Sequence, residues 1–254
     1  MKLGRLPLKT GTPANVRPAF YALRPGSWRD YVTLLHPPYT LWHLSYAMWG
    51  AALAGAHHPD RLAATLAAFL LAVGVAAHAL DELQGRPLRT RISPVVLWTV
   101  AALGLGGAVS IGIVGALAVS PWLLAFVAFG LFIAPAYNLE WFGKRFHSDT
   151  WFALSWGSFP LLTAYFADAE RLGIAAAAGA VMAFTLSLAQ RALSSRARTL
   201  RRRVRSIEGQ VLYNDGTVDD IDRHWATAPD ERALLLLSLS IFLGSLAVFA
   251  ATLR

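Results

Sequence analysis

The chain has 254 residues, of which 56% are hydrophobic and only 15% are charged. Soluble domains carry about 25% charged residues, so this composition excludes an ordinary water-soluble protein and favours one helical domain in a membrane. The chain has no cysteine, which excludes a disulfide framework and a cysteine metal site.

Seven apolar segments are predicted to cross the bilayer. A spanning helix needs about 20 mostly apolar residues, with about 17 as the lower end. The segments that meet or approach this length are, in chain order, 39–56, 62–80, 95–119, 121–138, 152–167, 173–190 and 234–251. The predicted fold class is therefore all-α, a multispanning transmembrane helical bundle of about seven spans.

The positions of the 23 lysine and arginine residues predict the orientation of this bundle. If the N-terminus is inside, the outer side keeps only Arg61, Arg171 and Arg254. Cytoplasmic loops of membrane proteins carry such an excess of basic residues. We therefore expect a multi-pass protein of the plasma membrane, with its N-terminus in the cytoplasm and its C-terminus outside.

The net charge of +8 has two explanations. Basic inner loops occur in any multispanning protein, and they account for the charge without nucleic acid as a partner. Alternatively, some of these cations bind an anionic substrate. The arginine-rich run 196–205 is expected to contact anionic lipids at the inner face.

The chain is expected to divide into two parts. Residues 1–36 form a cytoplasmic tail and an interfacial amphipathic segment, with Trp28 and Tyr31 at the level of the lipid headgroups. Residues 37–254 form the membrane-embedded bundle, which carries a cytoplasmic insert at 191–233.

Within this insert, Asn214, Asp215 and Gly216 indicate a turn. Pro229 and Asp230 are expected to begin the last helix. The four aspartates between 215 and 222 lack the spacing of an EF-hand, and a solvated loop explains them better than a cation site.

Three polar residues at the inner end of the second span are the first candidates for chemistry. His78, Asp81 and Glu82 have the spacing i, i+3 and i+4, which places residues on one helical face. A pair of carboxylates beside a bilayer suits Mg²⁺, which prefers oxygen ligands and is often shared with substrate phosphates. The alternative is that Asp81 and Glu82 mark the membrane boundary and pair with Arg86 and Arg89.

Cations close to these acids are candidates for binding phosphate. Arg86 and Arg89 follow the acidic pair, and Lys144 with Arg145 lies on the next inner loop. Arginine forks match phosphate oxygens, and lysine acts as a point charge. Ordinary basic residues of inner loops explain the same cations without a substrate.

Four stretches in a fixed order carry a resemblance to a known family. They are LLHPPYTLWHLSYAMWGAALAG (34–55), HALDELQGRPLRTRIS (78–93), AYNLEWFGKRFHSDTWFALSWGSFPLLTAYFA (136–167) and LSLAQRALSSRARTLRRRV (186–204). In order and context, the chain resembles the UbiA superfamily of intramembrane prenyltransferases, which attach isoprenoid chains to aromatic or other lipophilic acceptors.

The resemblance implies a divergent prenyltransferase that transfers a prenyl group from an isoprenyl diphosphate to a lipophilic acceptor, or a related isoprenoid-processing enzyme. It implies Mg²⁺ as cofactor, held by Asp81 and Glu82, which are also the implied catalytic residues. The residues implied to bind the diphosphate are Arg86, Arg89, Lys144, Arg145 and Arg198. The implied accessory residues are His78, Asn138 and Asp149.

The chain departs from the family pattern in both acidic motifs. In the first motif, NxxxDxxxD, the outer positions are occupied by His78 and Arg86, and the middle acid is Glu82, or Asp81 with a shift of one. In the second motif, residues such as Gln190 and Ser194 replace aspartates. The alternative function is therefore a non-catalytic membrane protein that keeps the fold and binds an isoprenoid lipid or scaffolds a partner.

Overall fold

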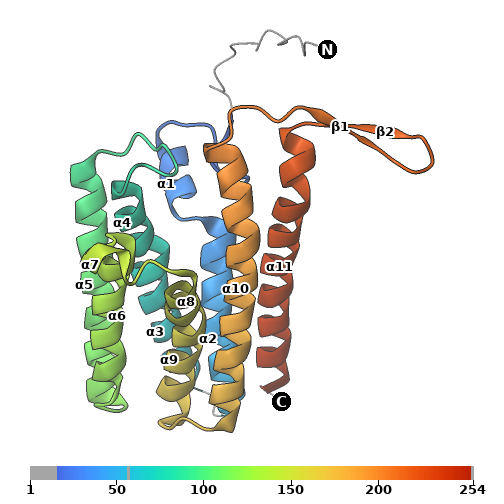
Figure 1. Ribbon diagram of the computed structural model, residues 1–254. Helices are drawn as coiled ribbons and strands as arrows, with labels where there is room; N and C mark the ends of the chain where they lie inside the picture. The colour runs from blue at the N-terminus through green and yellow to red at the C-terminus, as the bar shows by residue number, and fades with distance from the viewer. Residues whose placement is uncertain (1–15, 56–57, 253–254) are drawn as a thin grey trace.

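The protein is a bundle of long helices that run side by side, as the computed structural model in Figure 1 shows. The structure describes residues 16–55 and 58–252. Most of the predicted cytoplasmic tail therefore lies outside the described residues. The prediction of an all-α fold is confirmed for the bundle.

The first half of the chain forms helices α1 to α6. A short helix, α1 (Trp28–Leu34), precedes α2 (Pro37–Ala54). The chain returns through α3 (Pro59–Phe69), the π-helix η1 (Leu70–Ala77) and α4 (His78–Leu83), which form one continuous rod. Two more helices, α5 (Pro94–Ala118) and α6 (Leu123–Asn138), complete this half.

The second half contains the longest helices and a small hairpin. After α7 (Trp141–Lys144), the chain runs through α8 (Asp149–Phe152), the π-helix η2 (Ala153–Ser158) and α9 (Phe159–Ala169). Then follow α10 (Ile174–Arg202), the strands β1 (Gly209–Leu212) and β2 (Val218–Ile221), and α11 (Arg223–Thr252).

Four helical rods are long and apolar enough to cross a membrane within the described ranges. They are Pro59–Leu83, Pro94–Ala118, Ile174–Arg202 and Arg223–Thr252, and Leu123–Asn138 is a shorter apolar helix. The four rods indicate a membrane protein.

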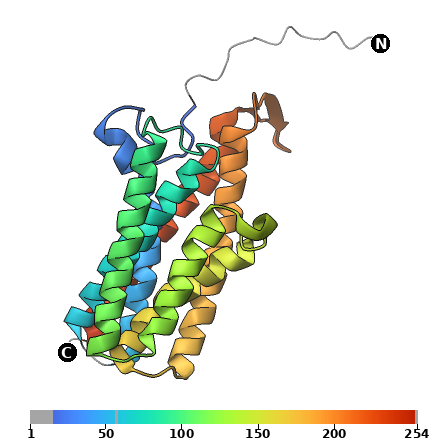
Figure 2. The same cartoon turned by 90° about the vertical axis from the view of Figure 1, so that its left-hand side faces the viewer.

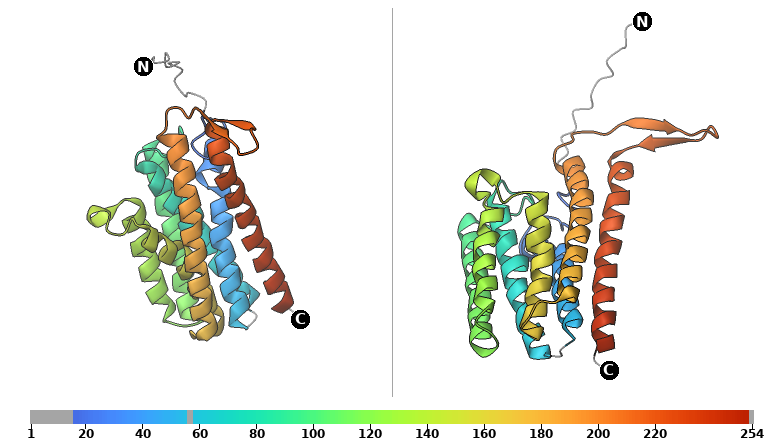
Figure 3. Two further views of the ribbon diagram at one scale, coloured as in Figure 1. Left: turned by 45° about the vertical axis from the view of Figure 1, so that its right-hand side comes forward. Right: turned by 60° about the horizontal axis from the view of Figure 1, so that its bottom comes forward.

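The insert 191–233 differs in part from the predicted loop. Strands β1 and β2 pair antiparallel, with Gly209 opposite Ile221, and the predicted turn lies between them. The hairpin projects away from the helices (Figure 3). The last helix begins at Arg223, and not near Pro229, because the Asp222 side chain accepts a hydrogen bond from the Trp225 backbone N–H at 2.7 Å.

Helix α2 lies against several other helices and supports the core. Trp42 and Tyr46 of α2 are fully buried and pack with Leu161 of α9 and Leu234 of α11. Figure 1 shows α2 behind α10, and Figure 2 shows the bundle from its side. We call the end of the bundle where α10 leads into the hairpin the hairpin end.

The approach of α2 to α9 depends on a residue without a side chain. A Cβ atom on Gly50 would lie 2.1 Å from the backbone oxygen of Leu161, whereas one on Gly106 of α5 would meet nothing within 4 Å. Close approach of backbones at small residues is how membrane helices gain packing energy.

We therefore predict that Gly50→Ala lowers the free energy of unfolding by about 1–3 kcal/mol, because the added methyl group overpacks the interface of α2 with α9. Thermal unfolding of the detergent-solubilised protein measures the change. Gly106→Ala is the matched control and should leave the midpoint unchanged or slightly higher. Equal midpoints for the two variants would contradict the close packing of α2 on α9 at Gly50.

Candidate functional site

A polar cavity of about 230 Å³ lies between the helices near the hairpin end. Helices α2, α4, α6 and α10 and the two π-helices contribute to its wall. Its charged lining consists of Asp81, Arg191, Arg198 and Arg202. Four histidines also line it: His36, His43, His78 and His147. This is a concentration of titratable groups inside an otherwise apolar bundle.

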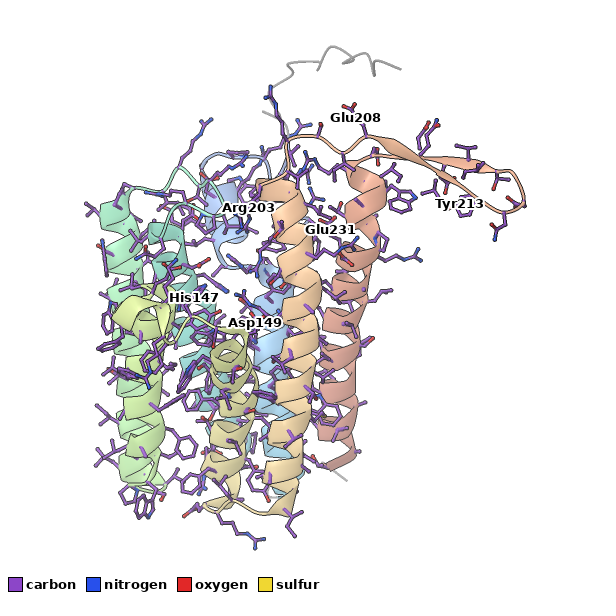
Figure 4. All side chains as sticks on the ribbon, in the orientation of Figure 1. His147, Asp149, Arg203, Glu208, Tyr213 and Glu231 are labelled. Carbon is purple, nitrogen blue, oxygen red and sulfur yellow. The ribbon has the colours of Figure 1, made fainter. Side chains whose placement is uncertain are left out.

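The arginines of the cavity share one face of α10. Arg191, Ser194, Arg198 and Arg202 follow each other at intervals of three or four residues, the spacing of one helical face. Arg191 is tied by its Nε to Asp149 Oδ1 at 2.7 Å, so its charge is paired. Asp149 is the first residue of α8 and is labelled in Figure 4.

The other two arginines are held by neutral groups. Arg198 donates to Ser195 Oγ at 3.2 Å, and Arg202 Nε donates to the Pro18 carbonyl at 3.1 Å. Within the described part of the chain, neither forms an ion pair with a carboxylate. Both arginines are half-buried, and a partly desolvated charge without an ionic partner attracts an anion, so these two guanidinium groups are the cavity's main attraction for an anion.

Three histidines are fixed in one tautomer by backbone carbonyls. The Nδ1 atoms of His43, His78 and His147 lie 2.7, 3.1 and 2.9 Å from the carbonyl oxygens of Trp156, Gly74 and Tyr137. A carbonyl only accepts, so each Nδ1 carries a hydrogen.

Two of these carbonyls belong to the π-helices, whose hydrogen-bond pattern differs from that of the flanking α-helices. Gly74 lies in η1 and Trp156 in η2. π-helical segments occur frequently at functional sites because they disturb the regular backbone ladder. Here they supply the acceptors that position His43 and His78 in the cavity wall.

His36 ends the polar lining where the chain enters α2. Its ring stacks on that of His78 with 4.0 Å between centroids, and its Nδ1 lies 2.9 Å from the Tyr21 hydroxyl. Burial, with smaller contributions from His78 and the nearby arginines, lowers the pKa of His36 well below its ordinary value. His36 is therefore neutral at physiological pH.

Several buried polar atoms of the cavity have no partner within the described residues. They are His36 Nε2, the Tyr137 hydroxyl and Gln190 Oε1, and each residue is less than 9% exposed. Buried polar groups in native proteins are almost always hydrogen-bonded, so such a group needs an explanation. Their common location in one cavity indicates a polar ligand.

The structure brings four of the predicted site residues to this cavity. Asp81, His78, Asn138 and Arg198 all line it. The Asp81 carboxylate makes no hydrogen bond to any described residue, and the Asn138 amide nitrogen donates to the Ala134 carbonyl at 2.7 Å. Asp149 does not line the cavity, but it holds Arg191, which does.

Glu82, the second predicted metal and catalytic residue, does not line the cavity. It is fully buried and accepts hydrogen bonds from Leu88 N at 2.9 Å, Thr90 N at 2.8 Å and the Thr90 hydroxyl at 2.9 Å. These bonds hold the loop after α4, in which Arg86 and Arg89 have left-handed φ angles of 55° and 57°. The role of Glu82 is therefore structural.

Four predicted diphosphate contacts also lie outside the cavity lining. Arg86 donates to the Ile92 carbonyl at 2.6 Å within its own loop, and Arg89 is exposed. Lys144 is exposed and paired with Glu140 at 2.8 Å, one helical turn away, and Arg145 is exposed. The structure does not bring these four residues to the cavity, because their charges have a local partner or face outward, and their contact with a diphosphate stays a prediction.

The sequence reasoning missed Arg191 and Arg202, and with them most of the histidines. The signal was present in the spacing of α10, because residues 191, 194, 198 and 202 share a face and Arg196 does not. Arg196 and Arg201 instead pair with Asp230 and Glu231 of α11. The arginine-rich run 196–205 is predicted to contact anionic lipids. In the structure, Arg196 and Arg201 form ion pairs with α11, whereas Arg198 and Arg202 line the cavity.

A second, larger cavity adjoins the polar one. It has a volume of about 560 Å³, lies among α3, α5, α6 and α9, and is lined almost entirely by apolar residues. One hydrophobic cluster separates the two cavities. Val73 and Trp156 of this cluster line the polar cavity, whereas Phe69 and Phe159 line the apolar one.

Comparisons of the chain with protein-family models, with curated proteins and with solved structures gave no match.

We predict that Glu82→Ala destabilises the protein by at least about 2 kcal/mol, because it leaves two buried backbone N–H groups and a hydroxyl without an acceptor. Asp81→Asn, one residue away, should cost much less, since the Asp81 carboxylate has no hydrogen bond to lose within the described chain. Thermal unfolding in detergent compares the two. The reverse order of stabilities would contradict the assignment of Glu82 to the loop and Asp81 to the cavity.

Proposed function

We propose that this protein is a UbiA-like intramembrane enzyme that transfers a prenyl group from an isoprenyl diphosphate to a lipophilic acceptor. One observation supports the proposal: Asp81, Arg198 and Arg202 line a single cavity, and an apolar cavity of about 560 Å³ lies on the other side of one hydrophobic cluster. An isoprenyl diphosphate has the same two parts, a multiply charged head and a long apolar tail.

The head of the substrate is matched by the guanidinium groups of α10. Arginine binds phosphate oxygens through charge-assisted hydrogen bonds that are shorter and stronger than neutral ones. The attraction is increased by the low dielectric of a buried site. The unpartnered hydroxyl of Tyr137 adds a donor on the opposite wall.

The tail is matched by the apolar cavity. Phe69, Phe126 and Phe159 contribute to its wall. The prenyl chain has to pass the cluster around Trp156 to reach it. Burial of each methylene is worth about 0.8 kcal/mol, so a long chain contributes much of the affinity.

The chemistry follows from the charges of the polar cavity. The bond between C1 of the prenyl chain and the diphosphate oxygen breaks, and its electron pair leaves with the diphosphate. The nucleophilic atom of the acceptor bonds to C1, and its proton passes to the Asp81 carboxylate. Arg198 and Arg202 stabilise the negative charge that develops on the leaving group, and the Trp156 ring shields the allylic cation.

The proposal includes the orientation expected from the sequence. Seven helical passes with the N-terminus in the cytoplasm place the hairpin end at the inner face of the plasma membrane. The exposed Arg203 and Arg205 then lie where anionic lipid headgroups are found. Arg61 and Arg171 lie at the opposite end, on the outer side.

A second candidate function is a non-catalytic protein that binds an isoprenoid lipid or scaffolds a partner. The neutral Gln190 and Ser194 in the cavity wall favour it, because they stand where the family carries acidic residues. The two candidates share the binding step and differ in whether the bond at C1 breaks. Release of inorganic diphosphate therefore distinguishes them.

We predict that the purified protein in detergent binds farnesyl or geranylgeranyl diphosphate, and that Asp81→Asn abolishes diphosphate release in the presence of a membrane-lipid extract while binding persists. Asp81 is the proposed base, so its loss affects the transfer more than the affinity. Calorimetry measures binding, and a phosphate assay after pyrophosphatase treatment measures release.

Lys144→Gln is the control for this experiment, because Lys144 is charged but lies outside the cavity lining. It should leave binding and release unchanged. Binding without release by the wild-type protein would favour the non-catalytic candidate. Absence of binding for every chain length would contradict both candidates as isoprenyl diphosphate proteins.

A further inference from the structure

The donor atoms around the polar cavity do not fit a magnesium site. Mg²⁺ takes a near-octahedral shell of oxygen ligands, usually with carboxylates. Both oxygens of Glu82 are occupied by the loop after α4, which leaves Asp81 as the carboxylate in the cavity lining. Across residues 16–55 and 58–252, no group of three or more His, Asp or Glu side chains is placed to hold a metal ion.

The positive charge of the cavity comes instead from α10. The charge of Arg191 is paired with Asp149, whereas Arg198 and Arg202 have only neutral hydrogen-bond partners within the described chain. These two cations and the single carboxylate of Asp81 leave an excess of positive charge in the lining. An anion therefore gains attraction here from the protein alone.

The fixed positions of the two guanidinium groups strengthen this argument. Arg198 and Arg202 are four residues apart on one helix, so they lie one turn above each other on the face that lines the cavity. The carbonyl of Pro18 and the hydroxyl of Ser195 hold their orientation, and each of these partners uses only one nitrogen of its guanidinium. Each arginine has five N–H donors, so most remain for a ligand.

We propose that Arg198 and Arg202 take the place of a divalent cation, so that this site binds the diphosphate directly and without metal. The inference rests on the proposed function for the identity of the substrate. It concerns the head group alone, and it therefore also applies to inorganic diphosphate, which has the same charged groups without the tail.

The test is calorimetric titration of the wild-type protein in detergent with inorganic diphosphate and with farnesyl diphosphate. Each titration is done in EDTA and in millimolar Mg²⁺. We expect binding of both ligands in EDTA, with an affinity no weaker than in Mg²⁺. Binding of farnesyl diphosphate that appears only when Mg²⁺ is added would overturn the inference and leave the proposed function standing.

Variants then locate the site. Arg198→Gln and Arg202→Gln should each weaken diphosphate binding in EDTA at least about tenfold, because each removes a charge-assisted contact. Arg203→Gln, at the exposed end of the same helix, is the matched control and should bind as the wild type does. Arg198→Lys should fall between wild type and Arg198→Gln, because lysine keeps the charge and loses the fork.

Each result separates this inference from the proposed function. One outcome is that the wild-type protein binds inorganic diphosphate in EDTA, that both Gln variants lose this binding, and that farnesyl diphosphate does not bind. This outcome would support the anion site and contradict the isoprenoid substrate. Metal-free binding that neither variant changes would overturn the assignment to Arg198 and Arg202. Thermal unfolding of each variant shows whether lost binding reflects lost folding.

Discussion

The structure is governed by the need to satisfy polar groups inside an apolar bundle. A buried carboxylate or backbone group without a partner costs free energy, and a membrane core supplies no water to replace that partner. The fold meets this need locally at several places, with Glu82 holding the backbone of its own loop and His43 and His78 bound to carbonyls of the π-helices. Against this background, the unsatisfied atoms of His36, Tyr137 and Gln190 stand out, because they line one cavity.

The sequence predicted the helical bundle better than the site. Apolar length is a strong signal for a spanning helix, and the turn at residues 214–216 was recognisable from its asparagine and glycine. The hairpin around that turn and the early start of α11 were not predicted, since short strands give a weak periodic signal and a proline inside a helix resembles a start. For the site, Asp81 and Glu82 are adjacent on a helix and therefore point about 100° apart, so the backbone decides which one faces the cavity.

The same reasoning explains why the structure does not gather the predicted cations at one cavity. Positive charge at an inner loop has several local uses, and sequence spacing alone does not separate them. Lys144 pairs with Glu140, the residue just before α7, whereas Arg198 lies on the face of a long helix that lines the cavity. Helical periodicity would have separated Arg198 and Arg202 from Arg196, because a residue four positions along lies nearly below the first and a residue two positions along lies on the other side. It would not have separated them from Arg201, which is three positions after Arg198.

Loss of an acidic motif does not by itself remove the chemistry. In a site that uses Mg²⁺, carboxylates are needed because the metal must be held, and the metal in turn neutralises the leaving diphosphate. In the proposed site, the guanidinium groups of Arg198 and Arg202 would supply the positive charge directly, so acids of a second motif would not be needed and neutral residues such as Gln190 and Ser194 would suffice. In the proposed transfer, the leaving diphosphate gains a negative charge as the bond at C1 breaks, and two fixed cations would stabilise that charge more than they stabilise the bound ester. A site that stabilises the transition state more than the bound substrate lowers the barrier to transfer. A site that stabilises the two states equally would only bind the substrate.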